Sequence, residues 1–113
     1  MVVKGEVWWV DFGEPVGSEP GYRRPAVVVS SDRFNRSRIA TVIVSAITSN
    51  LSLGQAPGNI FLDSAVTGLE RDSVINVSQT LVVDRSRLVT CPGKLDRSTM
   101  IRLDESLRLL FDL

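Results

Sequence analysis

Short runs of β-branched and aromatic residues, separated by clusters of glycine, proline and polar residues, are the feature that most constrains this chain. At residues 6–12, apolar and aromatic side chains alternate, which is the period of a strand with one buried face. Comparable runs predict further strands at residues 25–30, 39–46, 59–62 and 73–83. The last of these is expected to bend near Ser78 and Gln79, and Pro92-Gly93 is expected to break the run at 89–94.

The hydrophobic period changes near the C-terminus. Met100, Leu103, Leu107 and Leu110 follow one another at helical spacing, and Asp96 is placed to cap the helix that they predict. Short strands followed by one helix predict a mainly β fold with a C-terminal helix, built as a small bent antiparallel sheet or barrel. The 113 residues are expected to form a single domain, residues 1–113.

The absence of histidine restricts the chemistry that the chain can perform. Histidine is the commonest metal ligand and the commonest general acid or base at neutral pH, so zinc hydrolase and histidine-based ribonuclease chemistry are excluded. Cys91 is the only cysteine, which leaves neither an internal disulfide nor a thiolate cluster. No apolar run is long enough for a membrane helix or a signal peptide, so we expect a cytoplasmic protein.

Charge is balanced over the whole chain but not along it. Thirteen basic and 13 acidic residues cancel, so the chain as a whole is not a polyanion binder. Residues 23–38, however, contain five arginines and a single acidic residue, Asp32, so the local net charge is five minus one, or +4. Arginine suits the bidentate recognition of phosphate, so this stretch indicates a phosphate-bearing ligand.

Two polar residues at the ends of apolar strands are candidates for a site. Arg24 leaves a glycine-bearing loop at residues 13–23, and Pro25 biases its backbone toward the extended form. Thr48 ends the strand at 39–46 and is followed by further polar residues. By residue type alone, a solvated arginine and a threonine chosen for β-propensity explain both positions better than a site does.

Several segments, taken together in their order and spacing, resemble the MazF/PemK toxin family. They are GEVW and VDF near the N-terminus, GSE at residues 17–19, RPAVVVS at 24–30, AITS at 46–49, and the segments 81–88 and 103–107. Two positions depart from the family pattern: Pro20 stands where glutamine is usual, and Tyr22 where glycine is frequent. Both lie beside the candidate site, so loop shape and RNA preference are expected to differ.

The resemblance implies a toxin that cleaves single-stranded RNA at short sequences, inhibits translation and is neutralised by a MazE-like antitoxin. It also implies an SH3-like barrel and a homodimer that acts without metal or cofactor. The family's catalytic arginine and threonine correspond to Arg24 and Thr48.

The chemistry of RNA cleavage fits these two side chains in part. Arg24 offers a planar fork of donors to the charge of a phosphorane, and Thr48 can hold a phosphoryl oxygen for in-line attack. A guanidinium is poorly matched to proton transfer at neutral pH, because its pKa is about 12.5 or higher. Glu19, the carboxylate nearest in sequence, is predicted to act as the general base or to read an RNA base.

Polar residues around this pair are candidates for binding RNA, because amide side chains can read the edges of unstacked bases. They are Ser18, Ser49, Asn50, Asn76 and Gln79. For Asn76 and Gln79, ordinary loop polarity is at least as good an explanation. Trp8 and Trp9 are expected to be core or shielded residues and not stacking platforms.

Two other functions compete with RNA cleavage. A gyrase-poisoning toxin of the CcdB type depends on a tryptophan near the C-terminus, whereas both tryptophans here lie near the N-terminus. A non-catalytic SH3-like interaction module usually displays an aromatic groove, and few of the seven aromatic residues are free to form one.

Overall fold

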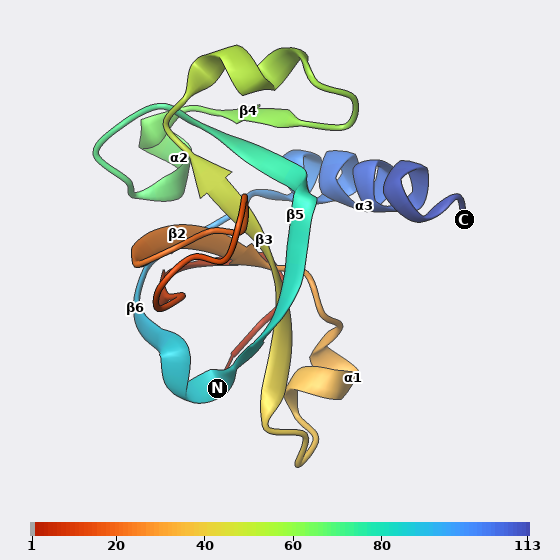
Figure 1. The fold of residues 1–113 in the computed structure, drawn as a ribbon. Helices are drawn as coiled ribbons and strands as arrows, with labels where there is room; N and C mark the ends of the chain where they lie inside the picture. Colours follow the sequence, from red (N-terminus) through yellow and green to blue (C-terminus); the bar gives the residue numbers. More distant parts are fainter. Residues whose placement is uncertain (1) are drawn as a thin grey trace.

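The computed structural model describes residues 2–113, which form one six-stranded antiparallel sheet with two short helices and one long C-terminal helix (Figure 1). The strands are β1 (Glu6–Asp11), β2 (Arg23–Val28), β3 (Thr41–Thr48), β4 (Ile60–Leu62), β5 (Ser73–Asp84) and β6 (Leu88–Lys94), in the sheet order β4-β5-β3-β2-β1-β6. The α-helices are the single turns α1 (Asp32–Asn35) and α2 (Ser64–Thr67) and the long α3 (Arg97–Phe111); η1 (Leu51–Gln55) and η2 (Arg85–Arg87) are 3-10 turns.

The sheet curls because β5 bulges against β3. Ala46 of β3 pairs with Asn76, whereas its neighbour Ser45 pairs with Thr80, so residues 77–79 have no partner in the ladder. A bulge of this kind bends the strand and increases its twist. The predicted bend near Ser78 and Gln79 is therefore confirmed. The sheet forms a half-barrel that stays open between its edge strands β4 and β6, as expected for a mainly β, barrel-like fold.

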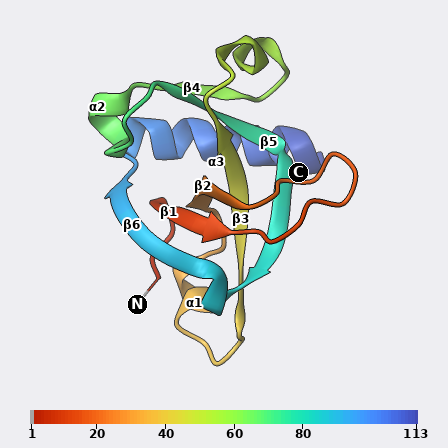
Figure 2. The ribbon, with the colours of Figure 1, turned by 60° about the vertical axis from the view of Figure 1, so that its left-hand side comes forward.

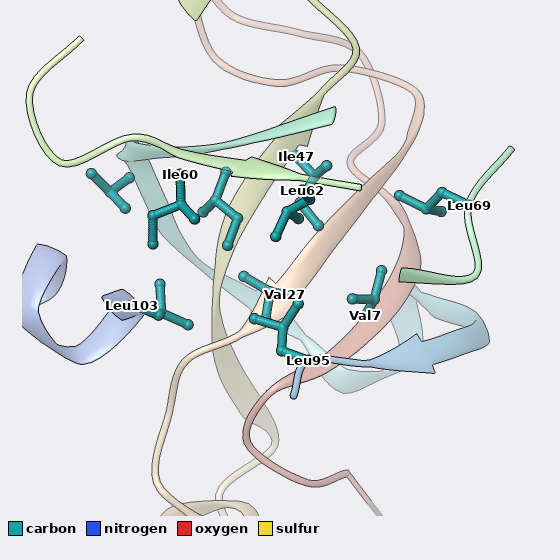
Figure 3. Close-up of a cluster of buried hydrophobic side chains, with 10 residues drawn as sticks. Val7, Val27, Ile47, Ile60, Leu62, Leu69, Leu95 and Leu103 are labelled. Atoms are coloured by element: carbon teal, nitrogen blue, oxygen red, sulfur yellow. The ribbon is translucent and has the colours of Figure 1, made fainter. Parts of the chain in front are cut away.

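Both faces of the curled sheet are buried. Along β2, Val27 joins a cluster that includes Leu103 of α3 (Figure 3). Ala26 and Val28 join a second cluster with Val44 of β3. This alternation is the period of an extended strand between two apolar layers. The strand ends that carry the candidate residues are thus fixed by close packing on both sides.

Helix α3 begins and packs as its sequence predicts. The Asp96 carboxylate accepts the main-chain N–H of Thr99 over 2.9 Å, which caps the helix. Leu103 is buried, and Met100 and Leu107 are half-buried against the same cluster, whereas Leu110 at the end of the stripe is exposed. The apolar contact with the sheet therefore ends one turn before the helix does.

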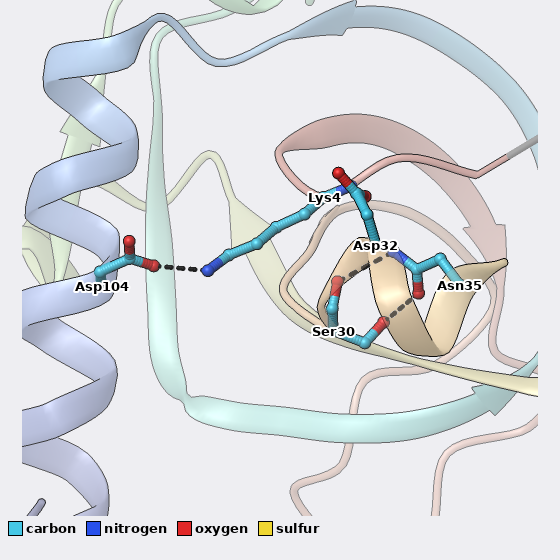
Figure 4. A network of polar contacts seen from close by, with 5 residues as sticks. All are labelled: Lys4, Ser30, Asp32, Asn35 and Asp104. Carbon is cyan, nitrogen blue, oxygen red and sulfur yellow. Dashed lines mark hydrogen bonds and ion pairs between the residues drawn. The ribbon is translucent and has the colours of Figure 1, made fainter. Parts of the chain in front are cut away.

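Polar contacts join the N-terminal segment to α3 and to α1 (Figure 4). The Lys4 ammonium lies 2.7 Å from the Asp104 carboxylate, and the main-chain N–H of Lys4 donates to Asp32. Asn35 and Ser30 are buried and hydrogen-bond each other through two contacts. A half-exposed ion pair contributes about 1 kcal/mol at most to the stability of the fold. The buried hydrogen bonds between Asn35 and Ser30 are therefore the stronger constraint on the position of α1.

Strand β6 is continuous, and the predicted break at Pro92-Gly93 is wrong. Thr90 pairs with Trp9 and Gly93 with Val7, so Pro92 lies in a bulge of an edge strand, where it need not donate to the ladder. Helix α2 packs beside this strand (Figure 2), and a Cβ on Gly93 would collide with the carbonyl of Thr67. Within residues 2–113, no helix is both long enough and apolar enough to span a bilayer.

Candidate functional site

A pocket of about 430 Å³ opens where β2 begins and β3 ends, and its lining includes both Arg24 and Thr48. The strand ends and the segment that precedes β5 supply its lining, which consists of Trp9, Arg24, Pro25, Ile47, Thr48, Ser49, Gly68, Leu69, Glu70, Arg71 and Ser73. Its volume is within the range of pockets that bind small organic molecules. The fold therefore brings the two candidate residues into one pocket.

The register of the sheet sets the relation between Arg24 and Thr48. Ala26 pairs with Ala46 in the antiparallel ladder of β2 and β3. The ladder ends at this pair, and each strand continues beyond it, β2 two residues back to Arg24 and β3 two residues on to Thr48. Because side chains alternate along a strand, both residues belong to the same face of the sheet.

Arg24 is held by its own loop. Its Nε donates to the carbonyl of Gly21 over 3.1 Å, and no other residue within 2–113 bonds its guanidinium. Gly21 is buried, and a Cβ there would overlap the ring of Pro15, so the loop folds closely on itself. The two terminal amino groups of Arg24, which is exposed, remain available to a ligand.

Tyr22, next to Gly21, has a strained backbone. Its φ of 59° lies in the left-handed region that favours glycine. Main-chain hydrogen bonds hold it there: its N–H donates to Gly13 over 2.6 Å, and its carbonyl accepts from Phe12 over 2.8 Å. This conformation explains why glycine is frequent at the position, and the departure to tyrosine carries a cost in backbone strain.

The hydroxyl of Thr48 has a free proton. Its Oγ1 accepts the main-chain N–H of Asn50 over 3.1 Å, and no acceptor for the hydroxyl proton lies among the described residues. Thr48 is half-buried, so its side chain is fixed by its neighbours but remains accessible from the pocket. The hydroxyl can therefore donate to an oxygen of a bound ligand.

The other predicted site residues lie in different places. Ser49 lines the pocket, whereas Ser18 and Glu19 belong to an exposed loop outside its lining. Gln79 is tied to that loop, because its Nε2 donates to the carbonyl of Ser18 over 2.6 Å. The role of Glu19 as general base stays a prediction.

Asn50 and Asn76 are engaged in local structure. The Asn50 carboxamide caps η1 and accepts from the hydroxyl of Ser52 over 2.6 Å. The carboxamide oxygen of Asn76 accepts from Ser78 and Asn59 beside the bulge of β5. These contacts match the explanation by loop polarity, and base reading by either side chain stays a prediction.

The basic stretch of the sequence does not gather at the pocket. Of its five arginines only Arg24 belongs to the lining, whereas Arg33 and Arg36 flank the end of α1. Helix α1 precedes Thr41, which starts β3. Thr41 and Thr48 lie at opposite ends of this strand, and its eight residues span about 25 Å. The local charge of +4 is therefore spread along the molecule.

Among the lining residues that the sequence did not predict as site residues, three carry aromatic or charged side chains. Trp9 is half-buried, packs against the larger cluster and lines the pocket, so its ring is both a structural and a site group. Glu70 and Arg71 enter from the connection that precedes β5. In the sequence they appear as an acidic–basic pair shortly before β5, the strand that pairs with β3, which carries Thr48.

Known structures define the class of protein that has this fold. MazF from Deinococcus radiodurans superposes with a TM-score of 0.82, at 21% identity over 99% of this chain and 97% of that one. A mycobacterial endoribonuclease in complex with its cognate antitoxin superposes with a TM-score of 0.77, at 19% identity over 99% and 94%. The architecture is thus that of the MazF-like toxins.

Sequence comparison identifies the family itself. The profile of the PemK-like, MazF-like toxins of type II toxin–antitoxin systems matches residues 3–111, and the chain belongs to this family. Endoribonuclease MazF6 of Mycobacterium tuberculosis is 42% identical over 113 residues, which cover 100% of this chain and 99% of that protein. The predicted family and the predicted class of endoribonuclease toxin are confirmed.

Proposed function

We propose that this protein cleaves single-stranded RNA at short sequences, without a metal ion, in the pocket shared by Arg24 and Thr48. One observation carries the proposal: the free terminal amino groups of the Arg24 guanidinium and a Thr48 hydroxyl with a free proton come from adjacent strands and line one open pocket. Cleavage of messenger RNA in the cytoplasm would inhibit translation.

The reaction that suits these groups is attack by the ribose 2′-OH on the adjacent phosphorus. The O2′–P bond forms, the bond from phosphorus to the 5′-oxygen breaks, and the products are a 2′,3′-cyclic phosphate and a 5′-OH end. The free amino groups of Arg24 stabilise the charge that develops on the phosphorane oxygens. Thr48 donates to one of these oxygens and fixes the angle of attack.

Proton transfer requires a base for the 2′-OH and a proton for the leaving oxygen. Glu19 is the base predicted from the sequence, whereas Glu70 is the carboxylate that lines the pocket. The variants Glu19→Gln and Glu70→Gln separate them. Loss of the acid limb of the pH–rate profile in one of them identifies the base, because this limb reports the protonation of the base.

The proposed partners are a cognate antitoxin and a second copy of this chain. A mycobacterial relative of this fold was solved with its cognate antitoxin, and an acidic extended segment would complement the exposed arginines here. The last turn of α3 and the residues after it leave apolar side chains uncovered, including Leu109, Phe111 and Leu113. Such a surface fits a homodimer contact.

The test is cleavage of a long RNA by purified protein in the presence of EDTA, followed by analysis of the new ends. We expect fragments with 2′,3′-cyclic phosphate and 5′-OH ends from the wild type. We expect a loss of at least about 100-fold in Arg24→Ala, because a donor to the transition state is removed. Arg33→Ala is the control, since it deletes the same charge away from the pocket and should cut normally.

Two results would contradict the proposal. The first is cleavage by folded Arg24→Ala at the rate of the wild type. The second is cleavage that requires added Mg²⁺, which would indicate a carboxylate–metal site. Sequencing the 5′ ends of the fragments gives the cleavage motif in the same experiment.

A further inference from the structure

Arg71 reaches the pocket from a segment that is anchored on both sides. Before it, Leu69 is 9% exposed and packs in the larger core cluster. After it, the Asp72 carboxylate accepts the main-chain N–H of Ser64 over 2.9 Å, and the Ser73 hydroxyl donates to the carbonyl of Arg71 over 3.1 Å. The backbone of Arg71 is therefore fixed relative to the sheet, although the residue itself is exposed.

The guanidinium of Arg71 has no protein partner among the described residues. The one ion pair within residues 2–113 joins Lys4 to Asp104, and no hydrogen bond there involves the side chain of Arg71. Its neighbour Glu70 lines the same pocket without pairing with it. A cation that is positioned by its backbone but left unpaired in a pocket is available to an anionic ligand.

The sheet order places the two arginines on opposite sides of Thr48. Strand β3 lies between β2 and β5, and Thr48 pairs with Val74 near the start of β5. Arg24 comes from the β2 side, whereas Arg71, three residues before Val74, comes from the β5 side. A strand of RNA whose cleaved phosphate lies at Arg24 and Thr48 would therefore extend its backbone toward Arg71.

We propose that Arg71 is a positioning residue that binds the RNA phosphate flanking the cleaved one. The inference builds on the proposed cleavage of RNA and adds a second contact to the same site. A flanking phosphate keeps its charge throughout the reaction, so the contact is equally strong in the ground state and the transition state. It lowers KM and leaves kcat unchanged.

The experiment compares Arg71→Ala and Arg71→Lys with Arg33→Ala, a matched loss of an exposed arginine outside the pocket. Binding is measured against salt concentration with a non-cleavable 2′-O-methyl copy of an RNA oligonucleotide that the wild type cuts, or a 2′-O-methyl oligonucleotide of mixed sequence if it cuts none. One lost phosphate contact reduces the slope of log affinity against log salt by about 0.7 for a single strand. We expect this decrease in Arg71→Ala, an increase in KM of about tenfold and an unchanged kcat. Lysine retains the charge and should restore the slope.

Two outcomes would overturn the inference. In one, Arg71→Ala and Arg33→Ala have the same salt slope and KM, so Arg71 acts only as a surface charge. In the other, kcat falls while KM and slope are unchanged, so Arg71 acts in the chemical step. Thermal unfolding monitors the fold of each variant, and Arg71→Gln replaces the alanine variant if that one is unstable.

Failure of the proposed RNA cleavage can be distinguished from failure of the inference about Arg71. A wild-type protein that cuts no RNA would refute the cleavage reaction, yet the salt slope of the non-cleavable RNA would still test the contact at Arg71. Normal cleavage by the wild type, combined with an unaffected Arg71→Ala, refutes only the inference about Arg71.

Discussion

The side-chain amide of Gln79 donates to the main-chain carbonyl of Ser18 over 2.6 Å and joins the bulge of β5 to the loop between β1 and β2. The same loop supplies the Gly21 carbonyl that holds the guanidinium of Arg24. Gln79 therefore acts on Arg24 indirectly, by limiting the motion of the loop.

Removing this tether in Gln79→Ala should loosen the loop and leave the sheet intact. A hydrogen bond of this kind contributes about 1 kcal/mol, so amides in residues 13–22 should exchange about fivefold faster. Hydrogen exchange measured on peptides that cover the loop provides the comparison. Gln55→Ala is the control, because Gln55 is an exposed glutamine of η1. Equal protection of the loop in both variants would show that Gln79 does not restrain it.

The free hydroxyl proton of Thr48 leads to a prediction about two conservative variants. Thr48→Val keeps the shape of the side chain but removes the hydroxyl, so kcat should fall by about 100-fold. Thr48→Ser keeps the hydroxyl and should retain most of the activity. Single-turnover cleavage of a labelled oligonucleotide measures both rates. Activity in the valine variant close to that of the serine variant would remove Thr48 from the chemical step.

The positive φ of Tyr22 predicts that glycine stabilises this position. Tyr22→Gly should raise the free energy of unfolding by about 0.5–1 kcal/mol, because relief of strain exceeds the extra entropy of the unfolded chain. Tyr22→Ala removes the ring but keeps the strain, so it should bring no gain. Urea denaturation at constant pH measures the difference. A gain of equal size in the alanine variant would attribute the effect to the exposed ring.

Asp96 should make the stability of the fold depend on pH under acidic conditions. Hydrogen bonds from the side chain and the main-chain N–H of Thr99 lower the pKa of this carboxyl in the folded protein. The unfolded chain therefore binds the proton more readily, and the stabilisation is present above the ordinary pKa of about 4 and is lost as the pH falls through the lowered value.

Asp96→Asn keeps an acceptor for the cap but cannot titrate. The difference in unfolding free energy between wild type and this variant should shrink as the pH is lowered from neutral toward 3. Chemical denaturation across this range measures it. A difference that stays constant with pH would show that the cap does not depend on the charge of Asp96.

Much of the fold could be predicted because local patterns and tertiary packing agree. The segments in which apolar and other residues alternate form strands, and the segment with helical spacing after Asp96 forms α3. The continuity of β6 could not be predicted, since Pro92 is tolerated only in a bulge of an edge strand. Edge position is a property of the finished sheet and has no signature in the local sequence.

The site was predictable to a different extent. Arg24 and Thr48 were found through their motifs, whereas Arg71 reaches the pocket only because β5 pairs with β3 in one particular register. Glu19 is close to Arg24 in sequence, but the loop that carries it folds onto itself at Gly21 and leaves Glu19 outside the pocket lining. The role of Glu19 as general base stays a prediction, and the carboxylate that lines the pocket, Glu70, lies far from Arg24 along the chain.

The sheet that brings Arg24 and Thr48 to one pocket also separates two kinds of evolutionary change. Neighbouring strands lie about 4.8 Å apart, and a slip of one residue would turn every side chain to the other face, so selection for a stable core also maintains the spacing of the pair. The loop before Arg24 lies outside this sheet and carries Pro20 and Tyr22. A protein built in this way can vary its loop while the sheet keeps Arg24 and Thr48, the two proposed reacting groups, in one pocket.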